Sequence, residues 1–232
     1  MMRHLIPAVA LSLVVSLSVA GARDLSVFSQ PTTVNDGNVG LGWYSQSEPR
    51  VRKNFKHADD FVLASDAEIN RVVWWGQSSR HRFDDLTNFD TFQIEFFEAE
   101  DVGGDWMPGA LLAVEVFDLV ETAPTETGRL TPNGAKEYRH ETTLTAPFAA
   151  DAGERYFIAV SAGMIETNSP SDAWQWQDAD LHDGWSVTYS WAGDTWTGFQ
   201  DSDSAFELYA VPAPATIAPL LVALLGSRRR GR

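Results

Sequence analysis

The chain has 232 residues, of which 44% are hydrophobic and 12% aromatic, so it is long enough and apolar enough to bury a core. Its formal net charge of −15 makes nucleic acid and anionic lipid surfaces poor partners. The chain contains no cysteine, which excludes disulfides, thiol catalysis, cysteine-bound zinc and a lipoprotein anchor.

Residues 1–22 have the pattern of a secretory signal peptide. A short basic start precedes an apolar run from Leu5 to Val19. Ala20 and Ala22 then form an A-x-A site, which predicts cleavage after Ala22. The apolar run is too short for a permanent membrane span, because ~15 helical residues cover only ~22 Å of a ~30 Å hydrocarbon core. We therefore expect an exported protein whose mature domain covers residues 23–210.

Within residues 23–210 the hydrophobic pattern has a period of two, which is typical of half-buried β-strands. Phe92, Ile94 and Phe96 alternate with polar residues, and the same alternation recurs at 114–116 and 156–160. Further strands are expected at 60–64, 69–76, 138–145, 173–177, 186–191 and 205–209. Turn sequences at 103–105, 108–109 and 151–153 separate some of these strands. The pattern predicts an all-β fold, a two-sheet antiparallel β-sandwich of the jelly-roll type whose first and last strands lie close together.

The common catalytic motifs are missing from the chain. It contains no G-x-S-x-G elbow, Walker loop, dinucleotide fingerprint or H-E-x-x-H motif, and its five histidines are scattered. A polysaccharide hydrolase would need two carboxylates across a cleft, and 32 acids do not single out a pair. Glu95, Glu115, Glu141 and Glu207 lie in strands where outward-facing acids are ordinary. We therefore expect no catalytic residues and no enzyme, with a polysaccharide hydrolase as the third alternative.

Tryptophan is the unusual feature of the composition, with nine copies. Trp174 and Trp176 would share one face of a strand, which could form a stacking platform for a sugar. Gln177, Asp178 and Asp180 are close enough in sequence to supply a polar rim. The opposing interpretation is that the two indoles fill the core and bind nothing.

The late part of the domain carries two further candidate features. Trp185, Trp191 and Trp196 follow in a stretch rich in Gly, Ser, Thr and Asp, and core packing is the default for each of them. Asp201 and Asp203 are candidate ligands for a structural calcium ion, although acidic loops are more often simply solvated. No other cofactor is expected. The leading role is a carbohydrate-binding module, and its rival is a structural component of the envelope or matrix.

Residues 211–232 have a three-part pattern. Pro212-Ala213-Pro214 precedes an apolar run from Ile217 to Leu225, and Arg228, Arg229 and Arg230 follow it. This tail resembles the PEP-CTERM sorting signal, with Pro-Ala-Pro in place of Pro-Glu-Pro. The resemblance implies transient membrane association through the hydrophobic helix, and cleavage near the motif by an exosortase-type enzyme. The protein would then reach the cell surface or the extracellular polysaccharide matrix.

A second resemblance covers the domain itself. Ala58-Asp59-Asp60-Phe61, Val72-Val73-Trp74-Trp75-Gly76, Pro108-Gly109 and Ser204-Ala205-Phe206-Glu207-Leu208 are similar to a domain common in exported proteins of planctomycete-type bacteria. That resemblance implies a β-sandwich fold and an exported habitat, and it implies no established activity.

Overall fold

The structure is a computed structural model and describes residues 24–32, 34–35, 38–39, 42–47, 55–78, 86, 89–132, 134–164, 174–179, 185–190, 195–200 and 202–210. The expected signal peptide and sorting tail, residues 1–22 and 211–232, lie outside the described residues, as do Asp180 and Asp201. In the described part, no helix is long and apolar enough to cross a membrane.

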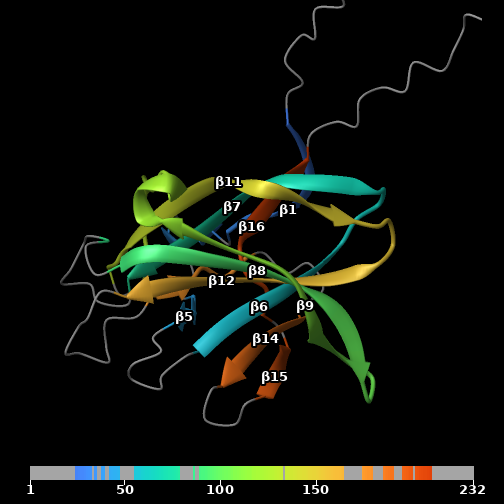
Figure 1. The fold of residues 1–232 in the computed structure, drawn as a ribbon. Coiled ribbons are helices and arrows are strands. Elements are labelled where there is room, and N and C mark those ends of the chain that lie inside the picture. The colour runs from blue at the N-terminus through green and yellow to red at the C-terminus, as the bar shows by residue number, and fades with distance from the viewer. Residues whose placement is uncertain are drawn as a thin grey trace, which may run out of the picture.

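The described chain forms two curled sheets that pack face to face (Figure 1). Sheet I contains β1 (Leu25–Gln30), β4 (Trp43–Tyr44), β7 (Ala67–Ser78), β10 (Thr125–Leu130), β11 (Lys136–Ala150), β13 (Trp174–Trp176) and β16 (Phe206–Ala210). Sheet II contains β5 (Gln46–Ser47), β6 (Phe55–Val62), β8 (Phe89–Val102), β9 (Asp105–Asp118), β12 (Arg155–Met164), β14 (Trp185–Ser190) and β15 (Thr195–Gln200). A separate small sheet joins β2 (Val34–Asn35) to β3 (Asn38–Val39), and a 3-10 turn, η1 (Leu119–Thr122), follows β9. The predicted all-β, sandwich-like architecture is confirmed.

Strand order places the two ends of the described chain together. Sheet I runs β1-β16-β7-β11-β10, with β13 also paired to β7 and β4 paired to β13. Sheet II runs β15-β14-β6-β5-β12-β8-β9, with β6 also paired to β12. Leu25 of β1 lies opposite Ala210 of β16, which confirms that the first and last strands are neighbours. The pairing is antiparallel throughout the two sheets except between β5 and β12, which are parallel.

Each strand expected from the alternation overlaps a strand of the structure, but one expected turn is wrong. Pro108 and Gly109 lie inside β9, where the pairing with β8 shifts its register between Phe97 and Ala99. An irregular ladder can accommodate a proline, which has no N–H to donate. The turn expected at 103–105 instead joins β8 to β9, and the one at 151–153 joins β11 to β12.

The core lies between the two sheets and is rich in aromatic rings. Trp74 of β7 is fully buried there, whereas Trp75 packs on the outer side of sheet I beside Val73 and Ala205, as expected for consecutive residues of a strand. Two histidines share this interior. The His140 ring stacks on Trp74 at 5.3 Å, and the His57 ring stacks on Trp43 at 5.5 Å.

Burial changes the acid–base behaviour of both histidines. Loss of contact with water lowers the pKa of His57 and of His140 to about 3, so both rings are neutral at pH 7. His140 Nδ1 lies 3.1 Å from the Thr122 hydroxyl, and His57 Nδ1 lies 3.0 Å from the Thr188 hydroxyl. The other ring nitrogen, Nε2, is buried in each case without a hydrogen-bond partner. Both histidines therefore behave as part of the packed interior.

Candidate functional site

The exposed platform predicted at Trp174 and Trp176 is wrong. Both indoles are completely buried, because β13 pairs with β7 in sheet I and turns them into the core. The Trp174 ring meets Phe92 edge-on at 5.1 Å, and the Trp176 ring lies 5.8 Å from Phe206. Trp176 Nε1 donates a hydrogen bond of 2.9 Å to the Ala205 carbonyl. These two tryptophans hold the sheets together and offer no face to a ligand.

The polar residues predicted beside that platform have other surroundings. Gln177 is fully buried, and its backbone bonds both to Trp75 and to Ala205. Asp178 is half-buried, and burial raises its pKa to about 7. One carboxylate oxygen of Asp178, Oδ1, is buried without a hydrogen-bond partner. With Asp180 outside the described residues, no exposed rim can be drawn from this set.

Asp203, one of the two candidate calcium ligands, is buried in a structural role. Its Oδ1 accepts a hydrogen bond of 3.0 Å from the backbone N–H of Trp185, at the start of β14. Its partner in the prediction, Asp201, lies outside the described residues. Among the residues that the structure describes, no group of three or more His, Cys, Asp or Glu side chains could hold a metal ion.

Aromatic side chains gather instead on the outer face of sheet II, the face turned away from sheet I. One row of this face crosses six strands in register and consists of Val114, Glu95, Ala159, Ala58, Val187 and Gly198. The next row includes Lys56, Tyr189 and Trp196. Residues opposite one another in neighbouring strands point to the same side of the sheet. We call this surface the curled face.

Small residues in the first row leave room for large rings above them. A Cβ atom on Gly198 would lie 2.2 Å from Cζ2 of Trp185, so the Trp185 indole covers the glycine directly. The Trp196 ring stands edge-on to Phe97 at 5.6 Å and lies 5.2 Å from Tyr189. Trp185, Tyr189 and Trp196 are each half-buried, so part of each residue stays in contact with solvent.

A charged pair adjoins these rings. Lys56 Nζ lies 2.7 Å from both carboxylate oxygens of Glu95. Glu95 points outward from the sandwich, as its strand position suggested, yet only 4% of it is exposed. The sequence alone predicts an ordinary surface acid at Glu95 and does not single out Lys56. No local signal connects the two residues, because sheet pairing brings together β6 and β8 through β12.

The turn end of the β8–β9 hairpin lies at the end of the curled face that is away from the Lys56–Glu95 pair. Trp185 Nε1 donates a hydrogen bond of 2.9 Å to the Trp106 carbonyl, which connects β14 to β9. The Arg155 guanidinium lies 5.5 Å from the centre of the Trp106 ring and forms an ion pair with Asp60. Strands β9 and β15, the two edges of sheet II, contact each other because the sheet is strongly curled (Figure 1).

A buried carboxylate supports the curled face from the inside. Asp59 of β6 accepts hydrogen bonds from the Gln30 side chain at 2.8 Å, from the Ser204 backbone, and from the Asp60 backbone at 2.9 Å. Burial raises the pKa of Asp59 well above its usual value, and the charge of nearby Asp203 acts in the same direction. Asp59 thus ties β1 and the segment before β16 to sheet II, beside the point where Asp203 fixes Trp185.

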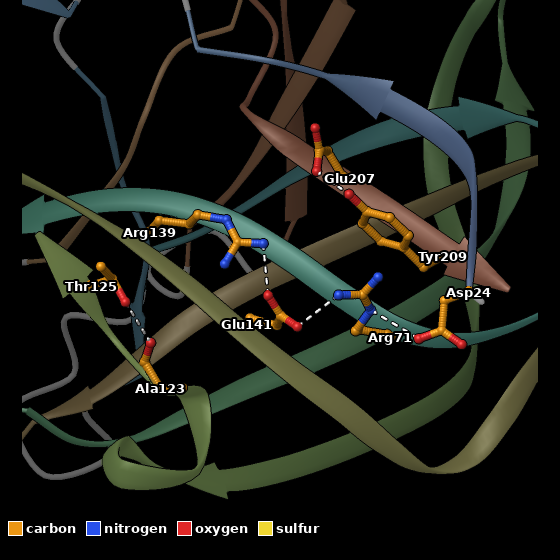
Figure 2. A network of polar contacts seen from close by, with 8 residues as sticks. All are labelled: Asp24, Arg71, Ala123, Thr125, Arg139, Glu141, Glu207 and Tyr209. Carbon is orange, nitrogen blue, oxygen red and sulfur yellow. Dashed lines mark hydrogen bonds and ion pairs between the residues drawn. The ribbon is translucent and has the colours of Figure 1, made fainter. Parts of the chain in front are cut away.

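The outer face of sheet I has a different surface (Figure 2). Arg71 reaches Asp24 at 3.2 Å and Glu141 at 2.7 Å, and Arg139 reaches Glu141 at 2.7 Å. The Arg71 guanidinium also lies 3.8 Å from the centre of the Tyr209 ring. The ring that could have stacked on a ligand is therefore covered by an internal cation. This network braces β7, β11 and β16 and leaves the curled face as the better candidate site.

Comparison with known proteins adds a family and little else. Residues 27–217 match the family model described as Domain of unknown function (DUF7901). No curated protein matches the chain. Two crystal structures of a CocE/NonD family hydrolase from Staphylococcus aureus are similar at 10% identity, with TM-scores of 0.28 and 0.30. They cover 81% and 79% of this chain, which spans only 37% of theirs, and so weak a likeness carries no inference.

Proposed function

The chain belongs to the family described as Domain of unknown function (DUF7901), and from this premise we propose that it is an exported, non-catalytic sandwich domain that binds a polysaccharide through the curled face. The observation that carries the proposal is the group of half-buried rings, Tyr189 and Trp196, beside the Lys56–Glu95 pair. Sugars present C–H-rich faces to aromatic rings and hydroxyl groups to charged or amide groups. The curled face offers both kinds of partner.

Electrostatics favour a neutral polysaccharide as the ligand. The chain carries a formal net charge of −15, which disfavours an anionic polymer. The positive charge of Lys56 on this face is matched by Glu95, and that of Arg155 is matched by Asp60. Both carboxylates are already bonded to cations, which supports binding without hydrolysis.

Export completes the proposal and rests on the two terminal sequence patterns. A signal peptide at residues 1–22 would direct the chain outward, and the PEP-CTERM-like tail at 211–232 would be processed by an exosortase-type enzyme at the membrane. The fold is compatible with tethering at one end. β1 and β16 lie together at the top of Figure 1, whereas β14 and β15 of the curled face lie at the bottom.

The binding proposal is tested by replacing Trp196 with alanine. Affinity electrophoresis against a panel of neutral polysaccharides should show binding by the wild type and at least a tenfold loss for Trp196→Ala, because stacking of a sugar ring on the indole is lost. Tyr44→Ala is the matched control, since Tyr44 is an exposed aromatic residue of sheet I. Thermal melts of both variants check that the fold is intact.

Three results of that experiment contradict the proposal. The first is a wild-type protein that binds none of the polysaccharides, in which case the structural envelope or matrix role replaces the binding role. The second is an equal loss of binding in the Trp196 and Tyr44 variants, which would place the ligand elsewhere. The third is a folded Trp196→Ala variant that binds as well as the wild type, which would also place the ligand elsewhere.

Export and processing are tested by mass spectrometry of the protein recovered from the bacterial surface or medium. The mature protein should begin at Arg23, because the A-x-A site ends at Ala22. It should also lack Arg228 to Arg232, because processing near Pro212 to Pro214 removes the segment that follows. A surface protein that retains the arginine cluster would contradict the sorting part of the proposal and leave the binding part untouched.

A further inference from the structure

Strand β9 exposes a strip of aliphatic side chains. Leu111 is 50% exposed, Leu112 48%, Val114 48% and Val116 60%. These residues follow one another along the second half of the strand, which is 14 residues long. A soluble domain seldom leaves so many neighbouring large aliphatic groups in water unless another surface covers them.

The same strand is the edge of sheet II. Within the described residues, β9 forms a ladder only with β8, so the backbone groups along its other side face away from the sheet. Natural edge strands are commonly protected by charged side chains. Between Asp105 and Asp118 the one charged residue is Glu115. Its carboxylate accepts hydrogen bonds from the backbone of Thr145 at 2.8 Å and of Ala146 at 3.1 Å, so it is engaged within its own chain.

We propose that this strip, residues 111–116, pairs with the same strip of a second copy of the chain. Two molecules with a net charge of −15 each repel one another over most of their surfaces. They can approach at a strip whose exposed side chains are aliphatic and whose one carboxylate, that of Glu115, is bonded within its own chain. The strip is also complementary to itself in an antiparallel arrangement. A two-fold axis at Val114 sets Val116 of each copy opposite Leu112 of the other, so that aliphatic groups meet aliphatic groups.

Such pairing would satisfy two requirements of the edge at once. The backbone groups along the outer side of β9 would find hydrogen-bond partners, and the exposed leucine and valine side chains would lose part of their contact with water to their cross-strand neighbours. Sheet II would continue across both molecules as one surface. The partner would be a second chain of the same kind, and the paired residues 111–116 of β9 are distinct from Tyr189 on β14 and Trp196 on β15.

A cysteine scan tests the proposal directly, because the natural chain has no cysteine. Leu111→Cys, Val114→Cys and Val116→Cys are prepared in the full-length chain and oxidised gently. The control is Val62→Cys, which is exposed but lies on β6, a strand paired on both sides. We expect a covalent dimer that is most abundant near the two-fold axis, at Val114, and at least fivefold less abundant at Val62.

Sedimentation of the Cys-free chain supplies the second measurement. The wild type should sediment as a dimer at tens of micromolar, and Val116→Lys should shift it to monomer with its melting temperature nearly unchanged, because Val116 is already mostly exposed. A wild type that stays monomeric overturns the proposal and leaves the strip to a different partner. Equal cross-linking at Val62 and at the β9 positions overturns it as well, since that result indicates random collision.

Discussion

In the described part of the chain, one group of tryptophans is completely buried between the sheets and another lies on the curled face or at its end. Trp74, Trp174 and Trp176 are completely buried between the sheets. Trp106 is exposed, and Trp185 and Trp196 are half-buried. The polar groups beside them differ in the same way, since the interior rings adjoin neutral histidines whereas the outer rings adjoin the Lys56–Glu95 and Arg155–Asp60 pairs.

This difference shows that contact with water separates a tryptophan that packs the core from one that is a candidate for binding a ligand. In the interior, loss of water disfavours charge, so the polar groups are neutral and the rings contribute stability. On the curled face the charged groups are paired and lie at the edge of water, so the rings beside them stay accessible. Residue type is the same in both regions, and position relative to the two sheets decides the role.

The comparison predicts its largest effect for Trp174→Ala. This change should lower the free energy of unfolding by about 3–5 kcal/mol, because it leaves a large cavity in the core. Trp196→Ala should cost less, about 2 kcal/mol, since Trp196 is only half-buried and less area is lost from its packing. Urea denaturation followed by circular dichroism measures both values.

Equal costs for the two variants would break the comparison. A cost below about 1 kcal/mol for Trp174→Ala would mean that β13 is not packed between the sheets. Trp174→Phe serves as an intermediate variant, because a smaller ring in the same place should recover part of the lost stability.

Much of the fold could be predicted from the sequence because strand alternation is a local signal. The runs at 92–96 and 156–160 became β8 and β12, and the turns at 103–105 and 151–153 were placed correctly. Pro108 was misplaced because a proline indicates either a turn or an irregular strand, and only the pairing with β8 decides between them.

The candidate site could not be predicted in the same way. Alternation shows that Trp174 and Trp176 lie on the same face of a strand. Whether that face points into the core depends on how β13 pairs with β7, which the sequence does not reveal. The Lys56–Glu95 pair forms between strands that are distant in sequence. Trp185 lies over Gly198 because the glycine has no side chain to keep the large indole away. The useful signal is the late tryptophan group, which contains Trp185 and Trp196, although core packing is the default expectation for both.

The smaller predicted effect concerns pH and the buried histidines. The pKa of His140 is lowered to about 3 by burial, against 6.5 in an unfolded chain, so the unfolded state binds a proton more readily between these values. The stability that neutral His140 contributes is therefore fully present above pH 6.5 and is lost as the pH falls from 6.5 towards 3. Between pH 7 and pH 5 His140 should account for a loss of about 2 kcal/mol, and His57 for a similar amount.

His140→Phe tests this prediction, because phenylalanine can keep the contacts with Trp74 and Phe92 and carries no buried nitrogen. Thr122 would still donate its hydroxyl hydrogen to the Leu119 carbonyl at 2.8 Å. The raised pKa values of Asp59 and Asp178 favour the folded state as the pH falls, but these carboxyls titrate equally in wild type and variant. The difference in unfolding free energy between pH 7 and pH 5 should thus be about 2 kcal/mol smaller in His140→Phe.

Thr122→Val, which retains the histidine, should keep the wild-type pH dependence. If His140→Phe also keeps it, the ring is solvated or charged in the folded protein, and the contrast between a neutral interior and a charged curled face fails at that residue.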